Sequence, residues 1–278
     1  MTPEPSAESG LVGVIGGSGF YSFLSEPTVV PVETPFGKPS EDPVVGSYGG
    51  RRVAFIPRHG RDHRFPPHKV NYRANMWALR AVGVRQVLAP CAVGSLRQEL
   101  GPGTLVIPDQ VVDRTWGREH TVYDEVGAVV HVSFADPYCP TGRAAVLGSA
   151  RDEDTTAVDG GTLVVVNGPR FSSRAESRWH AAAGWSVVGM TGMPEAALAR
   201  ELAMCFTAVA LVTDHDAGVE GEAGVTHAEV LEVFAKNVER MKDVIGRAIA
   251  QLPEPGSPAD TCSCRYALDG QPLPFPLP

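Results

Sequence analysis

The sequence predicts an α/β fold with a mixed, mostly parallel central β-sheet flanked by helices. Segments of strand length and helical segments alternate along the chain, which is typical of a parallel sheet covered by helices. The segment 206–212 is an apolar run of the kind expected when both faces of a strand are buried. The chain has 278 residues, of which 43% are hydrophobic. It can therefore enclose one large α/β domain or two small ones.

Composition excludes several classes of protein. The net charge of −8 argues against a nucleic-acid binder that neutralises phosphates. No apolar run approaches the roughly 18 residues of a membrane span, and residues 1–10, predicted to be disordered, lack the form of a signal peptide. The odd and scattered cysteines favour reduced thiols and a cytoplasmic protein. Cys262 and Cys264 form too isolated a pair to indicate a metal or redox site, so no metal is expected.

A glycine-rich loop containing Ser18 follows the first predicted strand, 11–15. Glycines let the backbone approach a ligand and Ser18 adds a hydroxyl, so the loop is a candidate phosphate site. It lacks both the dinucleotide fingerprint and the Walker lysine, and an ordinary turn explains it equally well. Gly49-Gly50 then predicts a hairpin between strands 44–48 and 52–56.

Basic side chains follow this hairpin at Arg58 and His59. A guanidinium presents a planar fork to an anion, and the imidazole adds a donor. Two other interpretations stay open. One is metal ligation by His59, His63 and His68, for which no supporting cysteine or carboxylate spacing is present. The other is a solvated basic loop.

The middle of the chain continues the alternation. We expect helices at 71–82 and 140–150, a long loop at 114–124, and strands at 84–90, 104–108 and 161–166.

Individual residues in this middle part are candidates for binding. Cys91-Ala92 follows strand 84–90, and Cys91 is interpreted as a small wall residue because no basic partner marks an activated thiolate. Phe171 follows strand 161–166; it is placed to stack on a planar ring, although packing is the default explanation for any Phe. His131 lies in an alternating segment and on its own indicates only a structural residue.

The segment 189–216 organises the rest of the chain. Met190 and Thr191 lie in a loop whose hydroxyl and N–H groups suit an anion, and Pro194 is expected at the first helical position. Strand 206–212 then ends at Asp214 and Asp216. Open α/β sheets bind ligands at the carboxyl ends of their strands, so these carboxylates are predicted to meet a group that carries hydrogen-bond donors. A solvated turn is the alternative.

The C-terminal part begins with a capping box formed by Thr226 and Glu229. An apolar stripe from Val230 to Ile245 predicts a long helix that closes the domain. Residues 253–278 are Pro-rich and are expected to form an extended tail, packed on a neighbour or disordered.

These strand ends together predict one site. Hydroxyls, N–H groups and a guanidinium would surround an oxyanion, and the paired acids would hold an amino-purine, with a sugar between them. A dinucleotide dehydrogenase is disfavoured by the missing fingerprint. A nucleoside-binding regulatory protein without catalysis remains an alternative.

A series of motifs carries a family resemblance: G-G-S-G-F, T-P-F-G-K-P-S, R-H-G, V-N-Y-R-A-N-M-W-A-L, G-P-R-F-S-S-R-A-E-S, M-T-G-M-P-E-A and T-D-H-D, in that order. With them the chain resembles the S-methyl-5'-thioadenosine phosphorylases of the trimeric purine nucleoside phosphorylase family. The match runs from about Val12 to the closing helix. It implies a single nucleoside phosphorylase domain at 11–252, a cytoplasmic homotrimer acting in purine and methionine salvage, and no cofactor besides the co-substrate phosphate.

The resemblance also assigns roles to residues of this chain. Asp214 is implied as the general acid, and Met190, Phe171, Asp214 and Asp216 as substrate contacts. Specificity falls to Ser172 and His227, and His131 matches a position that the family lends to the neighbouring subunit's site. Phosphate is expected to meet Ser18, Arg58, His59, Cys91, Ala92 and Thr191.

Two residues depart from the family pattern. Cys91 stands where the family usually has Thr, which weakens one expected phosphate or ribose contact. His227 stands where a small apolar residue usually lies beside the 5' substituent, while the ordinary nucleoside enzymes use His there to bind a 5'-hydroxyl. The leading hypothesis is phosphorolysis of S-methyl-5'-thioadenosine. The alternative is a purine nucleoside phosphorylase acting on adenosine, 5'-deoxyadenosine or methylthioinosine.

Overall fold

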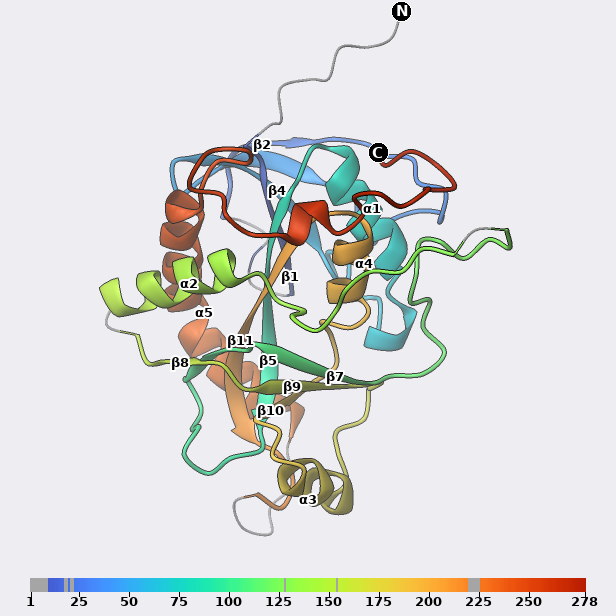
Figure 1. Cartoon of the computed structure of the whole chain (residues 1–278). Coiled ribbons are helices and arrows are strands. Elements are labelled where there is room, and N and C mark those ends of the chain that lie inside the picture. The colour runs from blue at the N-terminus through green and yellow to red at the C-terminus, as the bar shows by residue number, and fades with distance from the viewer. Residues whose placement is uncertain (1–9, 18–19, 21–22, 128, 154, 220–225) are drawn as a thin grey trace, which may run out of the picture.

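The computed structural model describes residues 10–17, 20, 23–127, 129–153, 155–219 and 226–278. A single mixed β-sheet forms its centre, with helices on both faces (Figure 1). One path through the sheet runs β2 (Ser25–Val29), β3 (Val44–Tyr48), β4 (Arg51–Pro57), β1 (Val12–Gly16), β5 (Gln86–Ser95), β10 (Val187–Gly189), β9 (Thr162–Val166) and β7 (Gln110–Arg114). The predicted fold class is confirmed.

The sheet branches at β5, the long central strand. β11 (Cys205–His215) pairs in parallel with β5 along almost its whole length, and its other edge pairs with β6 (Leu105–Ile107), which in turn pairs with β8 (Ala157–Asp159). β1 pairs in parallel with both β4 and β5, whereas β10 runs antiparallel to the end of β5. The branch therefore brings the carboxyl ends of several strands to one place.

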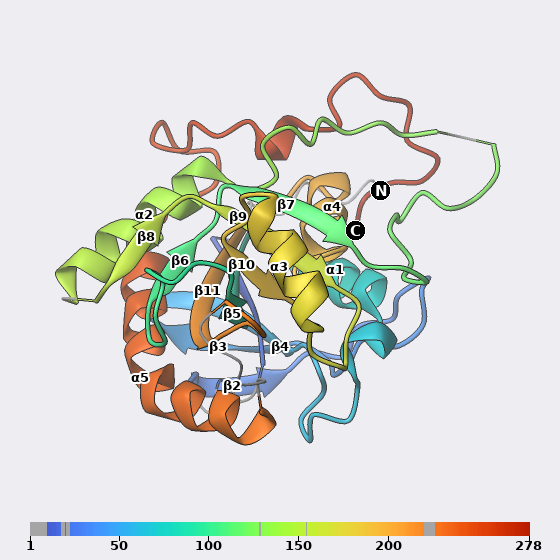
Figure 2. The same cartoon turned by 90° about the horizontal axis from the view of Figure 1, so that it is seen from below.

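Helices cover the two faces of the sheet as two pairs. α2 (Pro140–Asp152) and α5 (His227–Gln251) pack together on one face, and α1 (Tyr72–Ala81) and α4 (Glu195–Glu201) on the other (Figures 1 and 2). β1 is continuously apolar because both of its faces are buried. Val14 packs in the hydrophobic cluster under α2 and α5, and Ile15 packs in the cluster under α1 and α4. α3 (Arg174–Ala182) lies at the end of the domain near β9 and β10.

Local signals place the ends of these helices. Asn71 caps α1 by accepting from the Ala74 N–H, and both α3 and α5 begin with complete capping boxes, at Ser173 and Thr226. Each such cap satisfies backbone donors that the first turn leaves unpaired. Pro194 is the N-cap of α4 and not its first helical residue, which corrects the prediction.

Two other predictions about the elements need correction. The strand expected at 84–90 continues to Ser95, so Cys91 lies within β5, and the strand expected at 206–212 extends to His215. Four strands were not anticipated, namely β2, β7, β8 and β10. β2 is fully exposed, and β8 and β10 have three residues each, too few for a periodic signal.

The C-terminal tail packs on its own chain, contrary to the expectation of packing on a neighbour or disorder. It runs back from α5 over the ends of α2 and α4 (Figure 1). Cys262, Cys264 and Leu268 are buried. Among the described residues, short 3₁₀ turns also form at Pro67–Lys69 and Cys264–Tyr266. The ring of Phe275 stacks on Tyr123 with centroids 5.2 Å apart. The tail is therefore part of the folded domain.

Candidate active site

A cavity of about 480 Å³ opens where the ends of β4, β5, β10 and β11 meet the beginning of α5. The structure brings most of the predicted site residues to its wall, namely Arg58, His59, Cys91, Ala92, Phe171, Ser172, Met190, Thr191, Asp214, Asp216 and His227. Ser18 lies outside the described residues, although Gly17 and Phe20 beside it line the cavity. His131 does not line it; it lies in the arm that precedes α2.

Arg58 is buried in the wall, and its partner there is Glu195. Its Nε and Nη2 donate to the two carboxylate oxygens of Glu195 at 2.5 and 3.0 Å. Nη1 donates to the Pro90 carbonyl at 3.2 Å, and Nη2 also donates to the Ile15 carbonyl at 2.9 Å. Among the described residues these bonds leave one N–H of Nη1 for a ligand. Burial opposes the charge of Arg58, but the attraction and hydrogen bonds of Glu195 raise its pKa.

The sequence pointed to Arg58 as an anion fork but gave no sign of Glu195 as its partner. Glu195 is completely buried at the first residue of α4. The pair joins the residue that follows β4 to the first residue of α4. Arg58 therefore offers the cavity one directed donor, because the rest of its fork is used inside the protein and Glu195 balances its charge.

His59 lies beside Arg58 and is neutral. Its Nδ1 donates to the Phe65 carbonyl at 2.9 Å, and its ring stacks on His63 with centroids 4.3 Å apart. Burial, reinforced by the charge of Arg58, lowers the pKa of His59 to about 4. With Nδ1 carrying the proton, Nε2 is an acceptor, suited to the proton of a hydrogen phosphate ion.

Cys91 contributes a thiol and not a thiolate. Burial is the largest cause that raises its pKa to about 11, and the nearby positive charge of Arg58 only partly opposes it. A thiol in this state is a poor nucleophile. The structure agrees with its interpretation as a wall residue.

Asp214 occupies the last part of β11, where a bulge after Val212 shifts the register with β5. Burial raises the pKa of Asp214 to about 6; the Thr213 hydroxyl, which donates to its Oδ1 at 2.7 Å, opposes the shift, and the charge of Asp216 adds to it. Such a carboxyl can carry a proton near neutral pH, as a general acid must.

Asp216 adds a second carboxylate to the same wall. It is 4% exposed, and its Oδ2 has no hydrogen-bond partner among the described residues. A buried carboxylate oxygen without a partner is costly unless a ligand supplies a donor. Gly94 leaves room for both acids, since a Cβ there would lie 3.0 Å from Asp214 Oδ2 and 3.4 Å from the Asp216 Cβ.

The first turns of α5 form another wall. His227, Val230, Leu231 and Phe234 all line the cavity, and their spacing places them on one helical face. The sequence interpretation assigned Val230 and Phe234 only to the core-facing stripe. Leu231 remains 50% exposed. This wall combines an imidazole with apolar side chains, and His63 lines the same cavity. Burial lowers the pKa of His63, and the charge of His227 adds to this effect.

Arg118 holds the binding loops in place, and the sequence gave no signal for it beyond its position in an irregular loop. The residue is 8% exposed. Its guanidinium donates to the carbonyls of Met190 at 2.9 Å, Met193 at 2.6 Å and Asn167 at 2.9 Å. It also donates to the Tyr72 hydroxyl at 3.1 Å. The loops that carry Met190-Thr191 and Phe171-Ser172 are thereby fixed against α1.

The fold and this cavity define an enzyme of the nucleoside phosphorylase class. Residues 11–250 match the Phosphorylase superfamily, and the chain belongs to that superfamily.

Individual relatives are closely similar along the whole chain. A purine nucleoside phosphorylase of Streptomyces coelicolor is 61% identical and covers 96% of this chain and 97% of its own. An S-methyl-5'-thioadenosine phosphorylase of Mycolicibacterium smegmatis is 54% identical, and the match covers 96% of this chain and 100% of that one. The crystal structure of a methylthioadenosine phosphorylase from an antarctic soil metagenomic library superposes with a TM-score of 0.86 at 39% identity, covering 95% of this chain and 92% of that one. The predicted family resemblance is confirmed.

Proposed function

We propose that this chain catalyses the phosphorolysis of S-methyl-5'-thioadenosine to adenine and 5-methylthioribose 1-phosphate. The observation that carries the proposal is one cavity that contains both Arg58-His59-Thr191 and the buried acids Asp214 and Asp216. The first group suits an oxyanion, and the second suits the N–H edge of an amino-purine. A 480 Å³ cavity is large enough for a nucleoside.

The chemistry follows from these positions. Phosphate attacks C1' of the sugar as the glycosidic bond breaks, through a transition state resembling an oxocarbenium ion. The departing purine takes up the bonding electrons, and the carboxyl proton of Asp214 transfers to its ring nitrogen. A positioned acid of this kind is worth about 10²–10⁴-fold in rate. Arg58 and Thr191 hold the phosphate for attack, which contributes by proximity.

No metal or organic cofactor takes part in this proposed reaction. The new C–O bond to phosphate replaces the C–N bond to the purine, and the only proton that moves is supplied by Asp214. Oxidation state does not change, so no redox partner is required.

A second substrate is favoured by His227. A 5'-methylthio group suits the apolar side chains of Val230 and Phe234, but the imidazole of His227 in the same wall suits the 5'-hydroxyl of adenosine. The Streptomyces coelicolor relative that bears the name purine nucleoside phosphorylase fits this second candidate. Methylthioinosine is disfavoured, because the proton of Asp214 is used at the ring nitrogen and the carboxylate of Asp216 offers no donor to a 6-oxo group.

We further propose a cytoplasmic homotrimer in which His131 completes the site of a neighbouring subunit. In support, the His131 side chain is exposed and lies away from the cavity of its own chain. Its backbone is held by the Gln271 side chain, which accepts from the His131 N–H at 3.0 Å and donates to its carbonyl at 2.6 Å. The structure contains no helix, within its described part, that is long and apolar enough to cross a membrane.

The test is a comparison of base release from S-methyl-5'-thioadenosine, adenosine and methylthioinosine, with and without phosphate. The proposal predicts phosphate-dependent release of adenine, fastest from S-methyl-5'-thioadenosine, with Asp214→Asn as the impaired control. Faster release from methylthioinosine would show that the role given to Asp214 is wrong. Failure of every nucleoside to react with phosphate would leave a binding protein without catalysis.

A further inference from the structure

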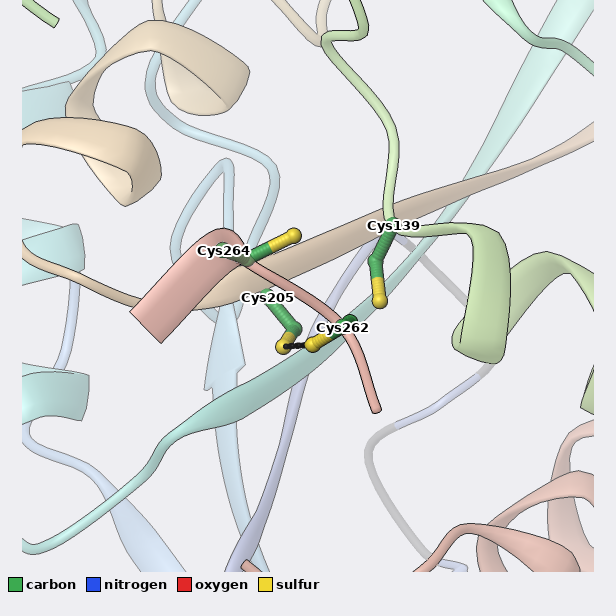
Figure 3. Close-up of side chains that lie close together, drawn as sticks. All are labelled: Cys139, Cys205, Cys262 and Cys264. Carbon is green, nitrogen blue, oxygen red and sulfur yellow. Dashed lines mark hydrogen bonds between the residues drawn. The ribbon is translucent and has the colours of Figure 1, made fainter. Parts of the chain in front are cut away.

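Four of the five cysteines come together outside the cavity. Cys139 is the N-cap of α2, Cys205 is the first residue of β11, and Cys262 and Cys264 belong to the tail. Their Sγ atoms all lie within 4.8 Å of one another, and the four side chains converge from three separate segments (Figure 3). None is more than 5% exposed.

Backbone structure holds Cys139 and Cys264 in this arrangement. The Cys139 N–H donates to the Phe206 carbonyl at 2.8 Å, which fixes the start of α2 against the start of β11. Cys264 begins a 3₁₀ turn, and Leu268 beyond it is buried in the main core. The Cys139 side chain makes no capping bond to its helix. Its sulfur points toward the other three (Figure 3).

The spacing of the sulfurs fits a single tetrahedral ion. With Zn–S bonds of about 2.3 Å, the sulfurs of a four-cysteine site are about 3.8 Å apart. Cys205 Sγ and Cys262 Sγ are separated by 3.2 Å, and no pair is more than 4.8 Å apart. Shifts of under about 1 Å would give regular coordination. Four buried thiolates are the ligand set that selects zinc over harder cations.

The charges around the cluster suit a thiolate site. The Nη2 of Arg200, which is 8% exposed, lies 3.9 Å from Cys264 Sγ. Four thiolates and one divalent ion leave net negative charge, which a buried guanidinium partly balances. Asp260 Oδ1 lies 3.6 Å from Cys262 Sγ, but this carboxylate is already paired with Arg265.

We propose that Cys139, Cys205, Cys262 and Cys264 bind one Zn²⁺ ion, which fastens the C-terminal tail to the domain. Binding releases the thiol protons to solvent, and no electron transfer is involved. The tail sequence alone showed only an isolated pair, because its two partner ligands lie 57 or more residues away in the chain. The site goes beyond the proposed reaction and does not depend on it.

Hydrogen bonds connect the cysteine cluster to the segment that carries His131. Arg200 donates to the carbonyls of Ser133 at 3.0 Å and Asp136 at 2.6 Å, between His131 and Cys139. Gln271 of the tail holds the His131 backbone on both sides. A metal ion that fixes the tail and Cys139 would therefore also fix residues 131–139.

Zinc content of the full-length protein tests the proposal. The protein is produced with zinc in the medium, purified under reducing conditions without chelator, and analysed by mass spectrometry for metals. We expect about one zinc per chain, lost in the Cys262→Ser/Cys264→Ser double variant and retained in Cys91→Ser, the matched control. Zinc no higher in the wild type than in the double variant would overturn the proposal, as would retention of zinc by that variant.

The same four sulfurs can instead form two disulfides, and the test separates this case. The mass of a second wild-type sample, purified and denatured without reductant, shows each disulfide as a loss of two hydrogens. Four free thiols with bound zinc support the proposal; two disulfides, or four free thiols without zinc, overturn it.

An absorption spectrum of the wild-type protein with Co²⁺ tests the site without the double variant, which need not fold. Reduced metal-free protein is titrated with Co²⁺, which reports coordination where Zn²⁺ is silent. The proposal predicts thiolate-to-cobalt charge-transfer bands and intense ligand-field bands of tetrahedral cobalt, saturating at one ion per chain and displaced by Zn²⁺. Absence of these bands would refute a four-thiolate site.

Discussion

Replacement of Asp214 by Asn tests whether this carboxyl is held protonated by burial. Its pKa is raised from 3.8 to about 6, a shift of about 2 units, and each unit corresponds to about 1.4 kcal/mol. The full shift would cost about 3 kcal/mol of stability at neutral pH. Because Asp214 faces an open cavity, solvent screening reduces the expected cost to about 1–2 kcal/mol.

The sign of the pH dependence follows from which state holds the proton. Between about pH 4 and pH 6 the native Asp214 keeps a proton that the unfolded chain has lost, so the free energy of unfolding falls as pH rises. The favourable contribution is complete below the unfolded pKa and is lost as pH rises through the folded pKa near 6. Asn never ionises and is nearly isosteric, and its amide oxygen can still accept from Thr213.

Urea unfolding of wild type and Asp214→Asn measures the effect. At about pH 7.5 the variant should be more stable by about 1–2 kcal/mol, and at about pH 4.5 the two should nearly coincide. Protein concentration is held constant, because assembly changes apparent stability. Activity on 6-amino purines should fall by about 10²–10⁴-fold in the same variant, with 6-oxo purines relatively favoured. A stability difference that is independent of pH would refute the account of Asp214.

Three further substitutions test other walls of the site. His227→Val should raise the ratio of kcat/KM for S-methyl-5'-thioadenosine over adenosine by about tenfold or more; an unchanged ratio would mean that His227 does not contact the 5' group. Glu195→Gln leaves the buried Arg58 without its counter-charge and should cost about 3–5 kcal/mol in urea unfolding, whereas a cost below about 1 kcal/mol would show that the pair is not what fixes Arg58. Gly94→Ala places a Cβ 3.0 Å from Asp214 Oδ2, so the KM for the nucleoside should rise while the KM for phosphate changes little; an equal rise in both would argue against separate ends of the cavity.

The fold was largely predictable because local patterns dominate it. The apolar run that ends at Val212 and the capping box at Thr226 each specify one element without reference to the rest of the chain. β10 escaped prediction because three residues cannot show a period, and its pairing with β5 and β9 supplies what its own sequence does not. The ends of β5 and β11 were misjudged because strand pairing carries both past the apolar run.

The convergence of the candidate residues on one site was predictable, but the contacts that hold them in place were not. Strand ends, glycines and paired acids mark Arg58, Thr191 and Asp214 as candidates, but Glu195 and Arg118 become visible only when distant segments meet. An apolar helical stripe looks the same whether it faces a core or a cavity. For that reason Phe234 was assigned to the core.

The cysteine cluster was also not predictable from the sequence, because its members are far apart in the chain. Spacing within the tail gives no metal pattern, because two of the four proposed ligands lie in other elements of the fold. Only the packing of the tail against α2 and β11 brings the sulfurs together. The sequence-based expectation of no metal followed from a search for local spacing alone.

A crystal structure of the protein with a non-reactive adenine nucleoside and sulfate would test the central claim most directly. The account predicts the adenine edge against Asp214 and Asp216, the sulfate beside Arg58, His59 and Thr191, and the sugar between them in one cavity. Sulfate bound at the acidic end, or a nucleoside bound outside the cavity, would contradict it.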